Sequence, residues 1–404
     1  MSRMKNLSKR LTPMFACKTP AAPSVQDTHL RATGVTVMRT ALVSLLVTLA
    51  PLVAGAQELR STGADTACGC RIVLQKLAQL GRAEDTIAIL GSSTVARDSR
   101  GRFYVGGILP YAGVAVFDSA GRHLATMGRA GNGPGELSRV RYVRTIAGDT
   151  LLVHDDHRMT VFDPTGAYLR AALLPAGPRA FRFTPLGDGQ VVLNNYFPTH
   201  AAFVLLGRNH EVVREFGKSV GGDRFGSDEL QFRVADVGGG RFAAVQQYHR
   251  FLVQIWDTNG RLVREFNRSP PWFPRYTREQ RRPLGFASRY PVVMGAWGDI
   301  DQRHLWLVAS VPDPSWKEPA CNPLPGAPRG EGSRCAPIPM SAQQRAWDTI
   351  VEVLDLDTGR VLVSQRFDED LTGFMEGGLL YALRENDDGL MVIDVWRARI
   401  VPGS

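Results

Sequence analysis

The stretch Thr160-Val-Phe-Asp-Pro-Thr-Gly-Ala-Tyr-Leu169 decides the fold, because near copies of it return along the chain. An apolar run is followed by an Asp-x-x-Gly turn and then by a second run, which is the pattern of two strands joined by a tight turn. Further copies lie at Val114–Leu124 and Gln254–Leu262. A unit this small cannot bury its own apolar face, so it must stack on neighbours of the same kind.

Each unit extends from this stretch into four short strands, expected near 142–147, 151–154, 159–162 and 168–173 in the best copy. The turn returns in degenerate form in other units, with Gly207 and His210 replacing Asp and Gly in the third. The turn positions are Asp118, Asp163, Gly207, Asp257, Asp355 and Asp394. Six units are therefore predicted. Seven is the alternative, because the gap of 98 residues before Asp355 has room for another.

A ring of such units is an all-β fold, namely a six-bladed β-propeller of four-stranded antiparallel blades. We expect it to cover residues 85–404, after an N-terminal segment at 57–84 and with an insertion at 311–348. The last unit ends soon after its third strand, and the run Thr86–Leu90 precedes the first unit without belonging to it. We expect this N-terminal run to close the last blade, because closure protects sheet edges.

Two adjoining segments resemble the NHL-repeat type of six-bladed propeller found in exported bacterial proteins. A glycine-rich link at Gly128–Glu136 precedes a strand, a polar loop and a V-F-D-x-x-G turn, which begin at Leu151. The resemblance covers roughly residues 85–401 and implies the propeller fold. It implies no single activity, because this fold serves lactonases, lyases and binding modules alike.

Residues 1–56 have the properties of a leader, with a secretory signal at about 38–56. The apolar run Ala41–Ala54 is too short for a comfortable membrane span, and Ala54-Gly-Ala56 matches a cleavage site. Residues 1–37 precede a good start at Met38, so we expect a misassigned start codon; a long leader is the alternative. The protein is therefore expected to be periplasmic or secreted, with no transmembrane span after cleavage.

The charge balance argues against a nucleic-acid partner. The formal net charge is +9, but the leader holds seven Lys or Arg and one acid, which leaves +3 for the rest. With 44% hydrophobic residues the chain can bury a large core. We expect a folded monomer that binds no nucleic acid.

Export also favours a disulfide. Cys321 and Cys335 bracket a loop rich in Pro and Gly, and a bond that closes a loop of this size would contribute roughly 3 kcal/mol. We predict this pair. Cys68 and Cys70 are too close for an easy mutual bridge, and their pairing stays open.

The strand order places the connections on two different faces of the ring. Turns between the first and second strands, and between the third and fourth, are short and share one face. The other connections are long and share the opposite face; they include Gly128–Leu137, Gly217–Leu230, Asn267–Pro283 and Val311–Gln343. Binding is predicted on this loop-rich face.

Polar side chains gather on the loops between second and third strands and should converge at the mouth of the central channel. Such side chains suit a polar or anionic small molecule. The alternative is that Asp155 and Arg158 only hold their loop. The candidate ligand-binding residues are His154, Asp155, Asp156, His157, Arg158, Asn194, Asn195, Tyr196, Gln247, Tyr248, His249, Arg250, Arg384 and Glu385.

A second candidate surface is the basic, aromatic link after the fourth unit, together with the insertion. Aromatic and Arg side chains are common anchors of protein interfaces. The alternative is that these rings pack down on the blade edges. The candidate partner-binding residues are Trp272, Phe273, Arg275, Tyr276, Arg278 and Trp316.

Two functions therefore remain. The first is an exported module that binds a protein, peptide or glycan without a cofactor. The alternative is a metal-dependent, lactonase- or lyase-like hydrolytic enzyme with one divalent cation such as calcium. Asp155, Asn194 or Asn195, and Glu385 could imitate the acid–amide ligand set of lactonases with this fold. No motif assigns a catalytic residue.

Overall fold

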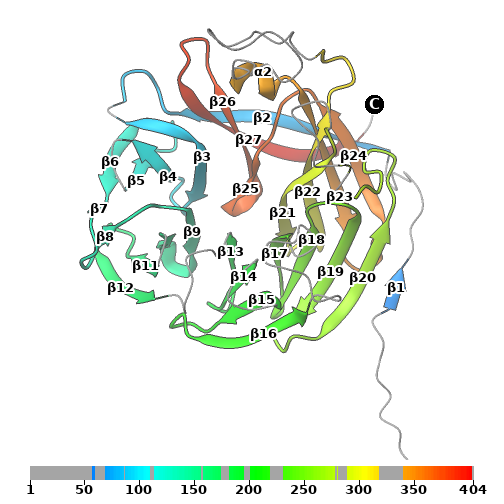
Figure 1. Cartoon of the computed structure of the whole chain (residues 1–404), viewed down its shortest axis with the longest axis horizontal. Coiled ribbons are helices and arrows are strands. Elements are labelled where there is room, and N and C mark those ends of the chain that lie inside the picture. The colour runs from blue at the N-terminus through cyan, green and yellow to red at the C-terminus, as the bar shows by residue number, and fades with distance from the viewer. Residues whose placement is uncertain are drawn as a thin grey trace, which may run out of the picture. The chain divides into compact units, whose positions relative to one another are not determined.

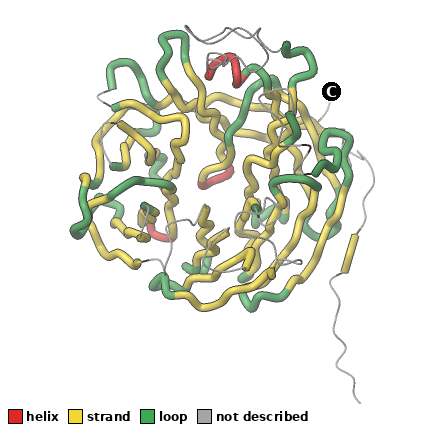
Figure 2. The backbone as a smooth tube through the Cα atoms, in the orientation of Figure 1, coloured by secondary structure: helices red, strands yellow, loops and turns green. Residues whose placement is uncertain are grey.

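The structure is a computed structural model that describes residues 57–59, 69–85, 87–109, 113–155, 158–173, 182–194, 201–218, 231–277, 280, 289–317 and 340–402. Six four-stranded antiparallel sheets stand around a central axis as the blades of a propeller (Figure 1). The tube view shows strands and connections with very little helix (Figure 2). The prediction of a six-bladed β-propeller is confirmed.

The strands of each blade follow one another from the axis outward. Blade 1 consists of β3 (Ala88–Arg97), β4 (Phe103–Leu109), β5 (Val114–Phe117) and β6 (His123–Met127). Blade 2 consists of β9 (Tyr142–Ile146), β10 (Thr150–His154), β11 (Arg158–Phe162) and β12 (Tyr168–Leu173). Blade 3 consists of β13 (Arg182–Pro185), β14 (Val191–Asn194), β15 (Ala201–Leu206) and β16 (Val212–Lys218).

The second half of the ring repeats this order. Blade 4 consists of β17 (Phe232–Gly238), β18 (Arg241–Gln246), β19 (Phe251–Asp257) and β20 (Leu262–Arg268), with β1 (Gln57–Leu59) parallel to β20. Blade 5 consists of β21 (Val292–Asp299), β22 (His304–Pro312), β23 (Trp347–Asp355) and β24 (Val361–Phe367). Blade 6 consists of β25 (Gly373–Met375), β26 (Leu379–Glu385), β27 (Met391–Pro402) and β2 (Cys70–Leu80).

An N-terminal strand does close the ring, but Thr86–Leu90 is the wrong strand. β2 pairs with β27 along its whole length, from Leu80 opposite Ile393 to Cys70 opposite Pro402. Most of Thr86–Leu90 belongs instead to β3, the inner strand of blade 1. The sequence of β2 is difficult to recognise as a strand, because a register shift between Lys76 and Ala78 breaks the alternation of buried and exposed side chains.

The same closure changes the role of Asp394. It lies inside β27 and not in a turn, because the outer strand of blade 6 arrives from the other end of the chain.

The predicted disulfide Cys321–Cys335 lies outside the described residues and stays a prediction. Cys70 is disulfide-bonded, and its partner also lies outside them.

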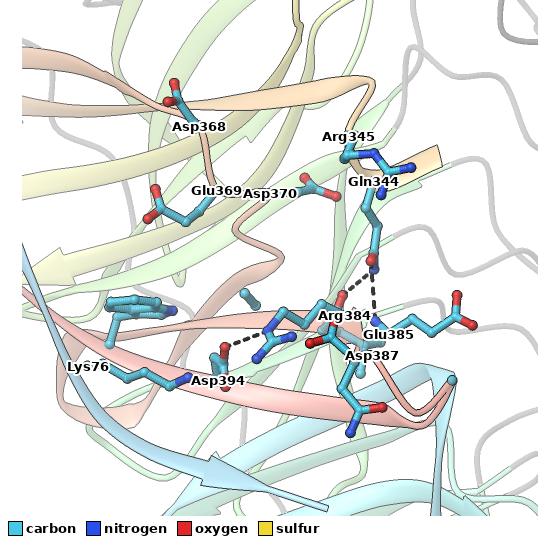
Figure 3. A pocket seen from close by; sticks show the side chains of 15 residues that line it. Lys76, Gln344, Arg345, Asp368, Glu369, Asp370, Arg384, Glu385, Asp387 and Asp394 are labelled. Atoms are coloured by element: carbon cyan, nitrogen blue, oxygen red, sulfur yellow. Dashed lines mark hydrogen bonds and ion pairs between the residues drawn. The ribbon is translucent and has the colours of Figure 1, made fainter. Parts of the chain in front are cut away.

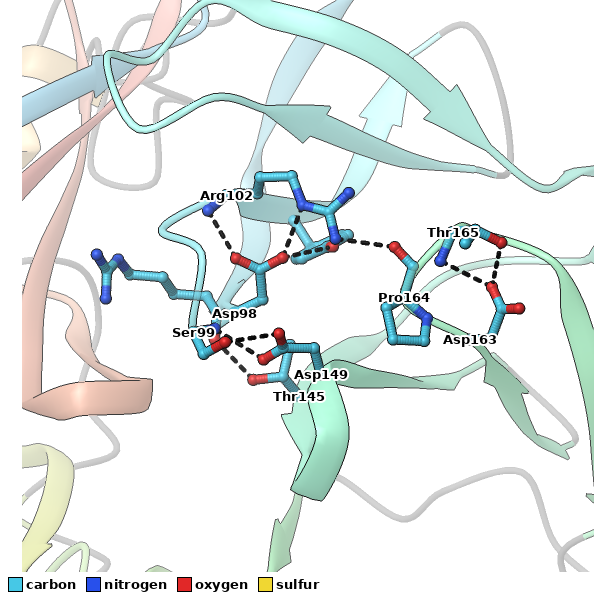
Figure 4. Close-up of polar contacts among 10 residues, drawn as sticks. Asp98, Ser99, Arg102, Thr145, Asp149, Asp163, Pro164 and Thr165 are labelled. Carbon is cyan, nitrogen blue, oxygen red and sulfur yellow. Dashed lines mark hydrogen bonds and ion pairs between the residues drawn. The ribbon is translucent and has the colours of Figure 1, made fainter.

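In blades 1, 2 and 4 an Asp-x-x-Gly turn joins the two outer strands. Asp163 accepts hydrogen bonds from the N–H groups of Thr165 and Ala167 and from the Thr165 hydroxyl (Figure 4). These bonds, first among them the one from the hydroxyl, lower the pKa of Asp163. Gly166 takes a left-handed conformation, with φ +92°, and His210 takes the equivalent place in blade 3 with φ +68°.

Small polar contacts also join neighbouring blades on this short-turn face. Ser99 donates its N–H and its hydroxyl to Asp149, and Arg102 reaches across to the carbonyl of Pro164 (Figure 4). These contacts tie blade 1 to blade 2 with few residues. The turns of this face are short, and they line a cavity of about 360 Å³ between the inner strands.

The core fills the spaces between blades. β15 is buried at every position, and its side chains point alternately to the two neighbouring blades. Val204 and Leu206 pack with blade 2, whereas Phe203 and Leu205 pack with blade 4. Because both faces of β14 and β15 are covered, these two strands are almost wholly apolar and lack the alternation of a half-exposed sheet.

As far as the structure describes them, the long connections leave the strands on the opposite face, as predicted. The link between β6 and β9 contains the short parallel strands β7 (Arg129–Ala130) and β8 (Glu136–Leu137). The connection between β22 and β23 runs from 313 to 346 and ends in the short helix α2 (Met340–Gln344). These connections are the loop-rich face of the ring.

Candidate functional site

A cavity of about 710 Å³ opens on the loop-rich face beside blade 6, and we call it the blade 6 groove (Figure 3). Four pieces of chain form its walls: α2 with the residue after it, the link 368–370, the end of β26 with its turn, and the outer strands β27 and β2. Its charged lining residues are Lys76, Arg345, Asp368, Glu369, Asp370, Arg384, Glu385, Asp387 and Asp394.

The side chain of Gln344 joins the helix α2 to blade 6. Gln344 donates from Nε2 to the carbonyl of Leu383 at 2.7 Å and accepts the N–H of Glu385 at 3.3 Å (Figure 3). The insertion from blade 5 thus becomes a wall of a groove in blade 6.

Asp394 pairs with two of the three basic groups of the groove and leaves one positive charge on the triad that they form. Its carboxylate lies 2.8 Å from Lys76 Nζ and 2.6 Å from Arg384 Nε, and it also accepts a bond from Gln79. Burial alone would raise the pKa of Asp394, but these hydrogen bonds outweigh it and lower the pKa. Asp394 is therefore charged at neutral pH, and it pairs with both cations.

The remaining charge of the groove is acidic. Asp368, Glu369 and Asp387 are exposed, and Arg345 is the basic lining residue outside the Asp394 triad. Asp370 lies deeper, where burial raises its pKa to about 6 although the Ser310 hydroxyl donates to it at 3.0 Å. Above pH 6 the groove therefore presents an excess of negative charge to a ligand.

The groove also has an apolar surface. Trp396 of β27 and Ala382 and Leu383 of β26 line it. The Lys76 ammonium lies 5.8 Å from the centre of the Trp396 ring. An aromatic ring beside carboxylates suits a ligand that carries both a positive charge and an aliphatic stem.

Two of the predicted ligand-binding residues, Arg384 and Glu385, line this groove. The cluster on blade 2 lies elsewhere. Asp155 accepts the N–H of Ser138 and is paired with Arg158, whose guanidinium also donates to the carbonyl of Glu136 at 2.6 Å. These two residues clamp the glycine-rich link, as the structural alternative proposed. Their role in binding a ligand stays a prediction.

The other predicted channel-mouth residues on blades 2 and 3 are also engaged in packing. His154 is buried, with its ring stacked at 6.3 Å on that of Tyr142. The Asn194 amide donates to the carbonyl of Ala202 and accepts the N–H of Phe232, which joins blade 3 to blade 4. Asp156, His157, Asn195 and Tyr196 lie outside the described residues.

The predicted residues of blade 4 form one loop with contacts of their own. Gln247 is buried and its carbonyl accepts the N–H of Val293. Tyr248 packs against the core between blades 4 and 5. The exposed Arg250 donates to Gln246, whereas the His249 ring contacts Tyr276 with centroids 5.2 Å apart.

The aromatic link packs mostly on the blade edges. Phe273 and Tyr276 are buried beside Phe251, and Trp272 is half-buried on the same cluster. Arg275 is exposed, and Arg278 lies outside the described residues. Whether these residues bind a partner stays a prediction.

Trp316 lies in the insertion and makes two contacts there. The Arg289 guanidinium lies 4.3 Å from its ring centre, and its indole N–H donates to the carbonyl of Ala342. The side chain therefore helps to hold the start of the insertion against its end.

Sequence reasoning missed most of the groove. Lys76 and Trp396 come from opposite ends of the chain, and nothing in either segment indicates their meeting. The run Asp368-Glu369-Asp370 was a usable signal, because it lies on a connection that the strand order assigns to the loop-rich face.

Within the described ranges, no group of three or more His, Cys, Asp or Glu side chains is placed to hold a metal ion. The ligand set of Asp155, Asn194 and Glu385 stays a prediction, with its members in blades 2, 3 and 6. No described helix has the length and apolar character to cross a membrane. The leader at 1–56 lies outside the described residues.

No family model matches the sequence, and no curated protein matches it. Among solved structures, the chain is similar to a member of the DUF4221 family from Bacteroides vulgatus, at 14% identity and a TM-score of 0.53, over 82% of this chain and 99% of that one. It is also similar to a Bacteroides fragilis protein described as a candidate exported protein, at 10% identity and a TM-score of 0.52, over 85% and 99% of the two chains. At such identities the similarity shows the fold alone.

Proposed function

We propose that this protein is an exported binding module of the NHL-repeat type that holds a positively charged segment of a protein or peptide in the blade 6 groove. The observation that carries the proposal is the groove itself: about 710 Å³, on the loop-rich face, with an acidic excess beside Trp396. This volume lies within the range of ligand sites in proteins. We further propose that the protein works as a monomer without a resident cofactor.

The charge arrangement favours a basic peptide over a neutral glycan. The triad of Lys76, Arg384 and Asp394 keeps one positive charge, which offsets only part of the negative charge of the five other lining acids. A Lys or Arg side chain entering the groove would meet Asp370 at depth and Asp368 or Glu369 at the entrance. Complementary charge of this kind raises the association rate and rejects acidic competitors.

Calorimetric titration of trilysine into the full chain, purified after export, tests the proposal. Triglutamate and chitotriose serve as the anionic and glycan comparisons. We expect saturable binding of trilysine at pH 7.5 and none of triglutamate. The double variant Glu369→Gln, Asp370→Asn should weaken trilysine binding about tenfold or more, since the loss of two charge-assisted contacts removes at least about 1.4 kcal/mol.

The matched control is Glu215→Gln, which removes an exposed carboxylate from β16 of blade 3. It should bind trilysine as the unmodified protein does. Equal weakening by both variants would mean that trilysine senses only overall charge, and preferential binding of chitotriose would replace the proposed ligand with a glycan. Titration with calcium in the same cell tests the proposed absence of a cofactor.

A further inference from the structure

Three arginines line one cavity at the centre of the ring, which we call the axial cavity. Arg144, Arg182 and Arg233 lie on β9, β13 and β17, the inner strands of blades 2, 3 and 4. The cavity has a volume of about 40 Å³ and is also lined by inner-strand residues of blades 5 and 6, such as Gly295 and Phe374. None of its described lining residues is a carboxylate.

Arg233 is the most buried of the three. Its residue surface is 6% exposed, and its Nε has no hydrogen-bond partner in the part of the chain that the structure describes. No described carboxylate forms an ion pair with it. Burial, with the nearby Arg182 as a second cause, lowers the pKa of Arg233 to about 9. An arginine with this pKa is still charged at neutral pH.

The neighbouring groups do not supply the missing negative charge. The Arg182 guanidinium lies 5.7 Å from the ring centre of Tyr142, and Arg144 donates to the carbonyls of Val95 and Val143. The Asn194 amide is occupied on both sides by backbone groups. The phenols of Tyr142, Tyr248 and Tyr381 also interact with Arg233, and none of them is a carboxylate.

Glu376 is a half-buried acid that interacts with this cluster, through Arg144. Its carboxylate accepts the N–H groups of Arg97 and Thr145 at 2.9 and 3.0 Å, and it does not line the axial cavity. Burial raises the pKa of Glu376, which disfavours the charged form of its carboxyl group. Three guanidiniums therefore face a cavity that one carboxyl group outside it cannot neutralise.

We propose that the axial cavity is a binding site for one small oxyanion, which the three guanidiniums hold. Guanidinium groups present paired N–H donors that match two oxygens of a phosphate, sulfate or carboxylate. Without such an anion, the buried charge of Arg233 would destabilise the fold. A single water needs about 10–15 Å³, so the cavity holds about three, the size of a tetrahedral oxyanion or a short carboxylate.

The test compares thermal unfolding of the full chain in chloride, phosphate, sulfate and acetate at equal ionic strength. An anion that binds only the folded state raises the unfolding temperature in a saturable way. We expect a rise of several degrees for at least one oxyanion over chloride, and equilibrium dialysis with labelled phosphate, sulfate and acetate should show one ion retained per chain.

Arg233→Met removes the most buried cation and keeps an unbranched side chain. It should abolish the saturable rise and lower the retained oxyanion at least tenfold, and in chloride it should unfold at a higher temperature than the unmodified protein. Arg233→Lys should keep part of the effect. Arg399→Met, on an exposed position of β27, is the control and should behave as the unmodified protein.

Two outcomes would overturn the proposal. One is an unmodified protein that unfolds at the same temperature in all four salts and retains no anion on dialysis. The other is an equal rise in the unmodified protein and in Arg233→Met, since the anion would then bind elsewhere. Should Arg233→Met fail to fold, the dialysis of the unmodified protein and the Arg182→Met variant decide the same question. None of these unfolding and dialysis measurements depends on ligand binding in the blade 6 groove.

Discussion

Single residues decide how the groove responds to pH. Asp370 has an ordinary pKa of 3.8 when unfolded and about 6 in the folded protein, because burial disfavours its charge. Between about pH 4 and pH 6 the folded state therefore holds a proton that the unfolded state has released. It follows that the contribution of Asp370 to stability falls as the pH rises through this window.

Asp370→Asn should accordingly stabilise the protein at pH 7.5, by at most about 3 kcal/mol for a difference of about two pKa units. At pH 4 the variant and the unmodified protein should differ much less. Urea unfolding at the two pH values checks this. Asp368→Asn, at an exposed position two residues earlier, should change stability by less than about 0.5 kcal/mol at either pH. A gain for Asp370→Asn that is equal at both pH values would contradict the assignment.

At the scale of elements, β2 decides whether the ring is closed. It covers the edge of β27, which would otherwise expose unpaired backbone groups. Its buried side chains, Ile72, Ala78 and Leu80, pack into the cores on the two sides of blade 6. The strand therefore fastens blade 6 through both backbone bonds and burial.

Leu80→Ala should reduce the free energy of unfolding by about 2–5 kcal/mol, because Leu80 is fully buried and its truncation leaves a cavity. Val73→Ala is the control on the same strand, since Val73 is 41% exposed, and it should cost less than about 0.5 kcal/mol. Chemical denaturation measures both. Equal costs for the two variants would show that β2 contributes its backbone alone.

At the scale of the whole molecule, adjacent blades are joined by side chains as well as by core packing. Arg268 of β20 and Glu352 of β23 form an ion pair between blades 4 and 5, with both side chains at most 3% exposed. The Arg268 guanidinium also lies 5.1 Å from the ring centre of Phe251. A pair this deeply buried fixes the position of blade 4 against blade 5, since moving the blades apart would leave each charge buried without its partner.

Glu352→Gln should destabilise the protein by about 3–5 kcal/mol, because it leaves the Arg268 charge buried without a counter-charge. The double variant Arg268→Met, Glu352→Leu should be much closer to the unmodified protein, since it removes both charges and keeps apolar volume. Thermal and urea unfolding of the three proteins check the order. A double variant at least as unstable as Glu352→Gln would show that the pair contributes net stability of its own.

By itself, the sequence determined the blades. Strand alternation and the Asp-x-x-Gly turn are local properties, since Asp163 bonds residues within four positions and Gly166 needs only its own backbone freedom. The division into a short-turn face and a loop-rich face followed from strand order alone.

Only the tertiary structure decided which strand closes the ring and where ligands could bind. The bonds of Asp394 with Lys76 and Gln79 join residues more than 300 positions apart, and β2 does not alternate regularly. The axial cavity likewise collects Arg144, Arg182 and Arg233 from three blades, in each of which a single arginine on an inner strand is unremarkable in sequence. Burial and unbalanced charge are properties of the assembled ring, and no local pattern encodes them.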